Sequence, residues 1–96
     1  MKTWSVYLLR CADGSLYCGV TTDPARRLRQ HSAGTASKYT RSRLPLKEFW
    51  YASGLSMTEA LCNEARIKSL RNAELKTAAL MLLMNKYKCG ELKCST

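Results

Sequence analysis

Two tyrosines, an arginine and a histidine are the residues of this chain whose types and spacing could first suggest chemistry. Tyr7 and Tyr17 lie in two strand-like runs on either side of Asp13-Gly14, and Arg27 and His31 follow in a stretch with a helical start signal. Residues four apart lie on one side of a helix. A guanidinium there can bind two phosphate oxygens, and an imidazole can donate to a third or move a proton. The order suggests a phosphodiester-cleaving site, although a solvated cationic helix with an incidental histidine would look similar.

Glu64 interrupts a helical pattern of apolar residues. The pattern has the spacing of a buried stripe, with apolar side chains at Met57, Ala60, Leu61 and Ile67. Because a buried carboxylate without a partner is costly, we expect a divalent metal ion or an arginine to meet Glu64. Alternatively, Glu64 turns outward and pairs with Lys68 in an exposed contact that contributes little.

The register of the first two strands decides whether the two tyrosines can cooperate. A two-residue turn at Asp13-Gly14 would place Tyr7 and Tyr17 on opposite faces of the sheet. A three-residue loop, with the glycine in the left-handed region, pairs Tyr7 with Gly19 instead. We predict this second register, in which both phenols share one face and Gly19 leaves space beside them.

The elements that must position these groups follow from hydrophobic patterns and helix caps. Strands are expected at about 4–11, 15–20 and 46–52. Helices are expected at about 24–32, 56–70 and 73–87, with caps at Asp23, Ser56 and Asn72. Residues 34–45 are expected to form a surface loop. The order ββαβαα predicts an α+β fold, a three-stranded antiparallel sheet with flanking helices and the first strand in the middle.

The length of the chain limits its organisation. Its 96 residues are enough for one domain with a modest core. We expect residues 1–88 to form this domain and residues 89–96 to be a C-terminal tail. The longest apolar run, residues 78–84, is too short to span a membrane, and no early run resembles a signal peptide. A soluble cytoplasmic protein without a membrane partner is therefore expected.

The charge of the chain favours nucleic acid as a partner. Sixteen lysines and arginines against seven acids give a net charge of +9, which attracts polyanions through counterion release. In the expected loop, Lys38, Tyr39, Arg41 and Arg43 suit backbone phosphates and a stacked base. A basic face that only keeps the protein soluble, or an ordinary flexible loop, would look similar.

The last expected helix has more apolar side chains than one helix face can bury. Residues 80–84 are all leucine or methionine. This excess suggests a homodimer or a protein partner that docks on the helix.

Together these residues resemble the GIY-YIG nuclease superfamily, which includes homing endonucleases and the first nuclease module of excision-repair proteins. Ser5-Val6-Tyr7 stands where the first motif triplet would be, with serine in place of glycine, and Tyr17-Cys18-Gly19 matches the second. Arg27 lies ten residues after Tyr17, as the family arginine does, and His31 lies four beyond it. Glu64 follows the third strand, where the family keeps its single metal-binding glutamate. The resemblance covers about residues 3–75 and is closest to short stand-alone bacterial members.

The resemblance implies hydrolysis of DNA phosphodiester bonds with one Mg²⁺ or Mn²⁺ ion. Glu64 would hold the ion, and Arg27 would stabilise charge on the non-bridging oxygens. Tyr17 would draw a proton from the attacking water, directly or through His31, while Tyr7 would position Tyr17 or the phosphate.

Further residues are expected to contact the nucleic acid, namely Gly19, Lys38, Tyr39, Arg41, Arg43 and Lys68. Structured or damaged DNA is the expected substrate, because so short a chain has little room for a separate base-reading module. A nucleic-acid-binding module that keeps the fold without cutting is the alternative, and a protein-interaction subunit is a third possibility.

Overall fold

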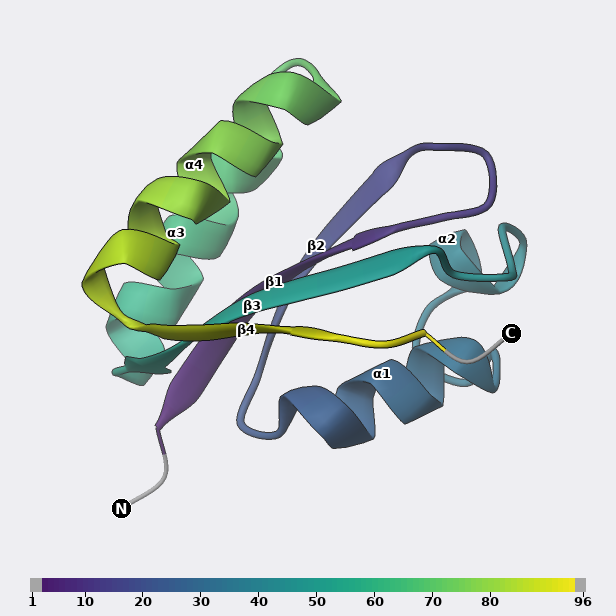
Figure 1. The fold of residues 1–96 in the computed structure, drawn as a ribbon, viewed down its shortest axis with the longest axis horizontal. Helices are drawn as coiled ribbons and strands as arrows, with labels where there is room; N and C mark the ends of the chain where they lie inside the picture. Colours follow the sequence, from purple (N-terminus) through teal and green to yellow (C-terminus); the bar gives the residue numbers. More distant parts are fainter. Residues whose placement is uncertain (1–2, 95–96) are drawn as a thin grey trace.

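The structure, a computed structural model, describes residues 3–94. A four-stranded antiparallel sheet runs through the molecule with helices on both of its faces (Figure 1). The strands are β1 (Trp4–Arg10), β2 (Leu16–Thr21), β3 (Glu48–Leu55) and β4 (Lys88–Leu92), in the spatial order β2-β1-β3-β4. The helices are α1 (Pro24–Ser32), α2 (Lys38–Arg41), α3 (Met57–Lys68) and α4 (Ala73–Lys86).

The first hairpin has the register that the sequence predicts. Tyr7 lies opposite Gly19, and Tyr17 lies opposite Leu9. Gly14 has a φ of 86°, a left-handed conformation that glycine adopts without steric cost. Since side chains alternate across a strand, this pairing brings both tyrosines to one face of the sheet.

The sheet separates two hydrophobic cores, one on each face. Under α3 and α4 the buried core residues are Val6, Leu8, Leu16, Cys18, Ala52, Leu55, Ala60, Ile67 and Leu80. On the face of α1 they are Tyr7, Leu9, Cys11, Leu28, Leu46 and Phe49. Strand β1 contributes to both cores, which explains why its sequence is apolar without alternation and why it lies between β2 and β3.

A fourth strand corrects the prediction of three. In β4, Gly90 lies opposite Tyr51 of β3, so residues 88–92 belong to the sheet although most of them were expected to be tail. The sequence of β4 combines charged residues with a glycine and has little intrinsic strand preference, so pattern reading misses it. Residues 95 and 96 of the expected tail lie outside the described residues.

The three long helices begin at the predicted caps. The side chains of Asp23, Ser56 and Asn72 each accept a hydrogen bond from a backbone N–H in the first turn. The short helix α2 was not predicted, and it occupies part of the expected loop. Its cap is Ser37, whose side chain accepts the N–H of Thr40. The observed order is therefore ββααβααβ rather than ββαβαα.

The buried side of α3 is narrower than its sequence suggests. Ala60 and Ile67 are buried, whereas Met57 and Leu61 are 53% and 45% exposed. The predicted stripe was therefore wrong at these two positions. The sheet covers only the side of the helix that holds Ala60, Ile67 and, between them, Glu64.

Helix α4 has more apolar surface than the domain buries. Leu80 is its fully buried residue, whereas Leu75, Met81 and Leu82 are exposed. Within residues 3–94 there is no helix whose length and apolar character would let it cross a membrane.

Replacing Asp23 by alanine should destabilise the fold, because the side chain then no longer accepts the Arg26 N–H at the start of α1. We expect the free energy of unfolding to fall by about 1 kcal/mol, measured by urea denaturation. Asp23→Asn keeps the acceptor and should retain most of the stability. Identical unfolding curves for Asp23→Ala and the wild type would contradict this role of the cap.

Candidate active site

Aromatic side chains gather on the sheet face that packs against α1. We call Tyr7, Tyr17, His31 and Tyr39 the aromatic cluster, and Phe49 of β3 stacks on Tyr7 with ring centroids 5.0 Å apart. Tyr7 and Tyr17 come from β1 and β2, with ring centroids 6.4 Å apart. The His31 ring of α1 has its centroid 5.6 Å from that of Tyr7 and 5.2 Å from that of Tyr17. Tyr39 of α2 completes the cluster, with its ring centroid 5.9 Å from that of Tyr17. The predicted register thus brings both phenols beside the predicted histidine.

Gly19 provides the space in which the Tyr7 ring lies. A Cβ atom added at position 19 would come within 2.6 Å of the Tyr7 Cζ atom, well inside the sum of their van der Waals radii. The strand pairing places Gly19 directly opposite Tyr7, and both residues are buried. The structure therefore places Gly19 beneath the phenol rather than on an exposed surface.

His31 is buried, and both of its ring nitrogens have partners. Nε2 lies 2.8 Å from the Tyr7 hydroxyl, and Nδ1 lies 2.8 Å from the Thr40 hydroxyl. The side chain is only 1% exposed. Burial, together with the nearby Arg27 charge, lowers the pKa of His31 to about 4. His31 is therefore neutral near pH 7 and bonds to Tyr7, whereas the sequence suggested a phosphate ligand or a proton carrier for Tyr17.

The pKa of Tyr7 shows which charged groups lie near the cluster. Burial raises this pKa well above the usual range of a phenol, and Tyr17 raises it further. The Arg27 guanidinium lowers it and the Glu64 carboxylate raises it. Tyr7 thus stays protonated, and a cation from α1 and an anion from α3 both act on its hydroxyl.

Arg27 has an unused hydrogen-bond donor. Its Nε atom is the one buried side-chain nitrogen or oxygen without a hydrogen-bond partner among the residues that the structure describes. A buried donor left unpaired costs about 1–3 kcal/mol. An anion that reached the guanidinium would remove this cost, so Arg27 is suited to bind a phosphate.

Glu64 combines features of both sequence interpretations. Its Oε2 atom lies 3.3 Å from the Lys68 Nζ atom, and its side chain is 19% exposed, so the ion pair forms without turning the acid fully to solvent. Burial and then the Glu64 charge raise the pKa of Cys18 in β2. The carboxylate therefore lies beside β2, the edge strand that carries Tyr17.

The cationic residues around α2 divide into two groups. Lys38 and Arg41 are exposed. Arg43 instead bonds to the hairpin turn, with its Nε atom 3.0 Å from Asp13 Oδ2, and its guanidinium lies 3.8 Å from the centroid of the Tyr39 ring. Arg43 therefore fixes Tyr39 and covers part of its ring, whereas Lys38 and Arg41 remain available to an anionic partner.

Thr40 is a site residue that sequence reasoning missed. Its side chain is fully buried and bonds to Nδ1 of His31. A threonine among lysines and arginines gives no signal of burial. Its contact with His31 depends on α2, which was expected to be a loop.

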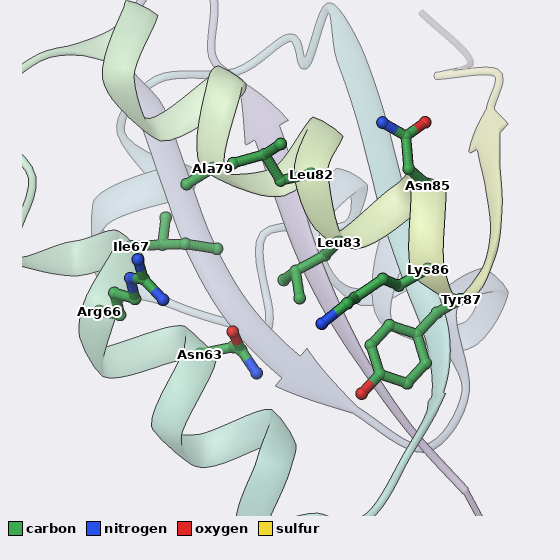
Figure 2. A pocket seen from close by; sticks show the side chains of 9 residues that line it. All are labelled: Asn63, Arg66, Ile67, Ala79, Leu82, Leu83, Asn85, Lys86 and Tyr87. Atoms are coloured by element: carbon green, nitrogen blue, oxygen red, sulfur yellow. The ribbon is translucent and has the colours of Figure 1, made fainter.

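A separate hollow lies on the opposite face of the sheet, between α3 and α4 (Figure 2). Its volume is about 530 Å³, and it is lined by Asn63, Arg66, Ile67, Ala79, Leu82, Leu83, Asn85, Lys86 and Tyr87. This lining contains no carboxylate, histidine or cysteine and no residue of the aromatic cluster. The groups suited to phosphate chemistry therefore lie elsewhere, around β2 and α1.

The model of a protein family described as the GIY-YIG catalytic domain matches residues 3–77, which is most of the chain. The chain belongs to the GIY-YIG family. It is 47% identical over 73 residues to a UPF0213 protein of Cupriavidus pinatubonensis, covering 76% of this chain and 81% of that one. A UPF0213 protein of Streptococcus agalactiae is 46% identical over 71 residues, a match that covers 73% of this chain and 81% of that protein. A UPF0213 protein from Bacillus halodurans, whose structure was solved by solution NMR, is 39% identical in sequence to this chain. The match covers 83% of this chain and 84% of that protein, with a TM-score of 0.47.

Membership of the GIY-YIG family confirms the resemblance seen in the sequence and suggests a nuclease. GIY-YIG nucleases generally use divalent metal ions. Within residues 3–94 there is no group of three or more histidine, cysteine, aspartate or glutamate side chains that could hold such an ion. Magnesium, however, needs only one or two carboxylates where water and substrate phosphates complete its shell. Glu64, whose charge raises the pKa of Tyr7, fits an ion of this kind, held largely by water and substrate rather than by a protein cage.

The stability of this GIY-YIG domain should fall in mild acid because of His31. Its pKa is about 4 in the folded protein and 6.5 in the unfolded chain, so between these values the unfolded chain binds a proton that the folded protein does not. We expect the free energy of unfolding to fall by roughly 2–3 kcal/mol over this range, measured by urea denaturation at a series of pH values.

The chain has a single histidine, so a His31→Gln variant provides the matched control. Carboxylates change the free energy of unfolding with pH equally in both proteins. The difference between the two pH profiles therefore gives the contribution of the His31 imidazole. Parallel profiles for the two proteins would show that His31 is not held neutral by burial.

Proposed function

We propose that this GIY-YIG domain is a divalent-metal-dependent endonuclease that hydrolyses phosphodiester bonds in DNA, with structured or damaged DNA as its substrate. The main support for this proposal is the unpaired donor of Arg27. Arg27 keeps a buried donor without a partner near the Tyr7 phenol, where a phosphate would complete its hydrogen bonds. A buried polar atom left unpaired in a folded protein often has a role in binding or catalysis.

Arg27 would bind the phosphate that is cleaved. A guanidinium stays charged at any working pH and can donate to two phosphate oxygens at once. In the transition state, charge grows on the non-bridging oxygens. A fixed donor in a partly buried site stabilises that charge more than water does.

The two tyrosines would have different tasks. The Tyr7 hydroxyl is buried, protonated and bonded to His31, which suits it to position Tyr17 or, through Arg27, the phosphate. Tyr17 is only partly buried, and among residues 3–94 its hydroxyl has no hydrogen-bond partner. Tyr17 is therefore the phenol that would take the proton of the attacking water.

Glu64 would hold the single Mg²⁺ or Mn²⁺ ion. When bound, the ion supplies positive charge for the departing oxygen. Lys68 now neutralises this carboxylate at 3.3 Å. With Glu64 holding the ion, Lys68 would be free to contact the phosphate backbone of the DNA.

The rest of the DNA would be recognised through its backbone. The net charge of +9 favours a polyanion, and Lys38 and Arg41 are exposed on α2 beside the aromatic cluster. Backbone contacts fix orientation without reading sequence. A domain of this size would therefore select DNA by its shape.

A second candidate is a nucleic-acid-binding module that keeps the fold but does not cut. The observation that favours it is the ion pair of Glu64 with Lys68, because a neutralised carboxylate holds a metal ion more weakly. Such a module would still bind DNA through Arg27, Lys38 and Arg41.

Arg27→Ala and Glu64→Gln should each slow the nicking of supercoiled plasmid by about 100-fold or more. The first removes a cation that would stabilise transition-state charge, and the second removes the carboxylate that would hold the metal ion. The measurement is the rate of conversion to open circles with Mn²⁺ or Mg²⁺ present. Arg26→Ala and Glu74→Gln are matched controls, since both residues are exposed on α1 and α4 and should retain the wild-type rate.

Equal nicking by the wild type and Glu64→Gln would refute the role of Glu64 in holding the metal. Fluorescence anisotropy with a branched duplex measures binding independently. Tight, salt-sensitive binding by a wild-type protein that never cuts would favour the non-catalytic module. Binding that ignores salt would count against both candidates.

A further inference from the structure

A buried chain of hydrogen bonds links α2 to the sheet. The Thr40 hydroxyl lies 2.8 Å from His31 Nδ1, and His31 Nε2 lies 2.8 Å from the Tyr7 hydroxyl. The three side chains are 0%, 1% and 2% exposed, respectively. Because bulk water does not reach this chain, protein groups decide where its protons lie.

A neutral imidazole has one donor and one acceptor, so two proton arrangements are possible. In the first, Tyr7 donates to Nε2 of His31, and Nδ1–H of His31 donates to Thr40. In the second, Nε2–H donates to Tyr7, and the Thr40 hydroxyl donates to Nδ1. The two arrangements leave the Tyr7 oxygen with opposite roles.

The first arrangement uses every donor in the chain. The Thr40 hydroxyl can then donate to the Ser37 carbonyl at 3.4 Å or to the Ser37 hydroxyl at 2.9 Å. In the second arrangement, the Tyr7 proton has no other acceptor among the residues that the structure describes. An unused buried donor is costly, so the first arrangement is favoured.

We propose that Thr40 is a positioning residue, which holds the proton of His31 on Nδ1 and so directs the Tyr7 hydroxyl toward Nε2. With its proton engaged in this way, Tyr7 presents only oxygen lone pairs to the site. The nearby Arg27 guanidinium can then donate to it. The effect on catalysis rests on the proposed nuclease function, whereas the tautomer is a property of the resting protein.

Two substitutions separate the hydroxyl from the shape of the side chain. Thr40→Val removes the hydroxyl at nearly constant volume, and Thr40→Ser keeps it. Long-range ¹H–¹⁵N correlation spectra distinguish the two tautomers of an imidazole, and a chain with one histidine gives a single set of ring signals. The spectra are recorded near pH 7, where His31 is neutral.

We expect the Nδ1–H tautomer in the wild type and in Thr40→Ser, and a shift toward Nε2–H in Thr40→Val. An Nε2–H tautomer in the wild type would overturn the proposal, as would an unchanged tautomer in a folded Thr40→Val protein. If Thr40→Val does not fold, the spectra of the wild type and of Thr40→Ser still show whether the His31 proton lies on Nδ1, as proposed, or on Nε2.

A second readout concerns catalysis. In plasmid nicking, Thr40→Val should lower kcat by about tenfold or more with a smaller change in KM, and Thr40→Ser should restore the rate. Equal kcat values for the wild type and Thr40→Val would overturn the claim that Thr40 contributes to catalysis through His31 and Tyr7. A wild-type protein that does not cut would refute the nuclease proposal alone, because the tautomer result stands without it.

Discussion

The hydrogen bond between the Tyr7 hydroxyl and His31 is the contact on which the rest of the site depends. It joins the central strand β1 to α1, and through Thr40 it extends to α2. Burial makes the contact strong and also keeps both groups uncharged. The site therefore has a neutral, rigid interior, and its charged groups, Arg27 and Glu64, lie around that interior.

The charged groups reach this interior from different layers of the fold. Arg27 comes from α1 on the face of the aromatic cluster, whereas Glu64 comes from α3, which packs against the opposite face. Their influences meet at Tyr7, near the edge formed by β2. Only the edge strand β2 lies beyond β1 on this side of the sheet, and the Glu64 charge acts on Cys18 of β2 as well as on Tyr7 of β1.

Short sequence patterns, such as a turn glycine or a helix cap, predict much of the fold. The features that they do not predict depend on contacts between segments that lie far apart in the sequence. The glycine of the first turn sets the register of the tyrosines, and the cap residues set the starts of three helices, because each acts over a few neighbouring positions. Strand β4 depends on β3, which lies more than thirty residues earlier in the chain. Similarly, the burial of Thr40 depends on α1, and the exposure of Met57 depends on how far the sheet extends beneath α3.

Strand β4 also affects how copies of the molecule behave toward one another. It covers the edge of β3 and forms the outer border of the sheet (Figure 1). Lys88 and Glu91 belong to this border strand. Charged side chains on a terminal strand discourage another chain from extending the sheet there. The five residues of this strand thus protect a small, strongly basic protein against edge-to-edge aggregation.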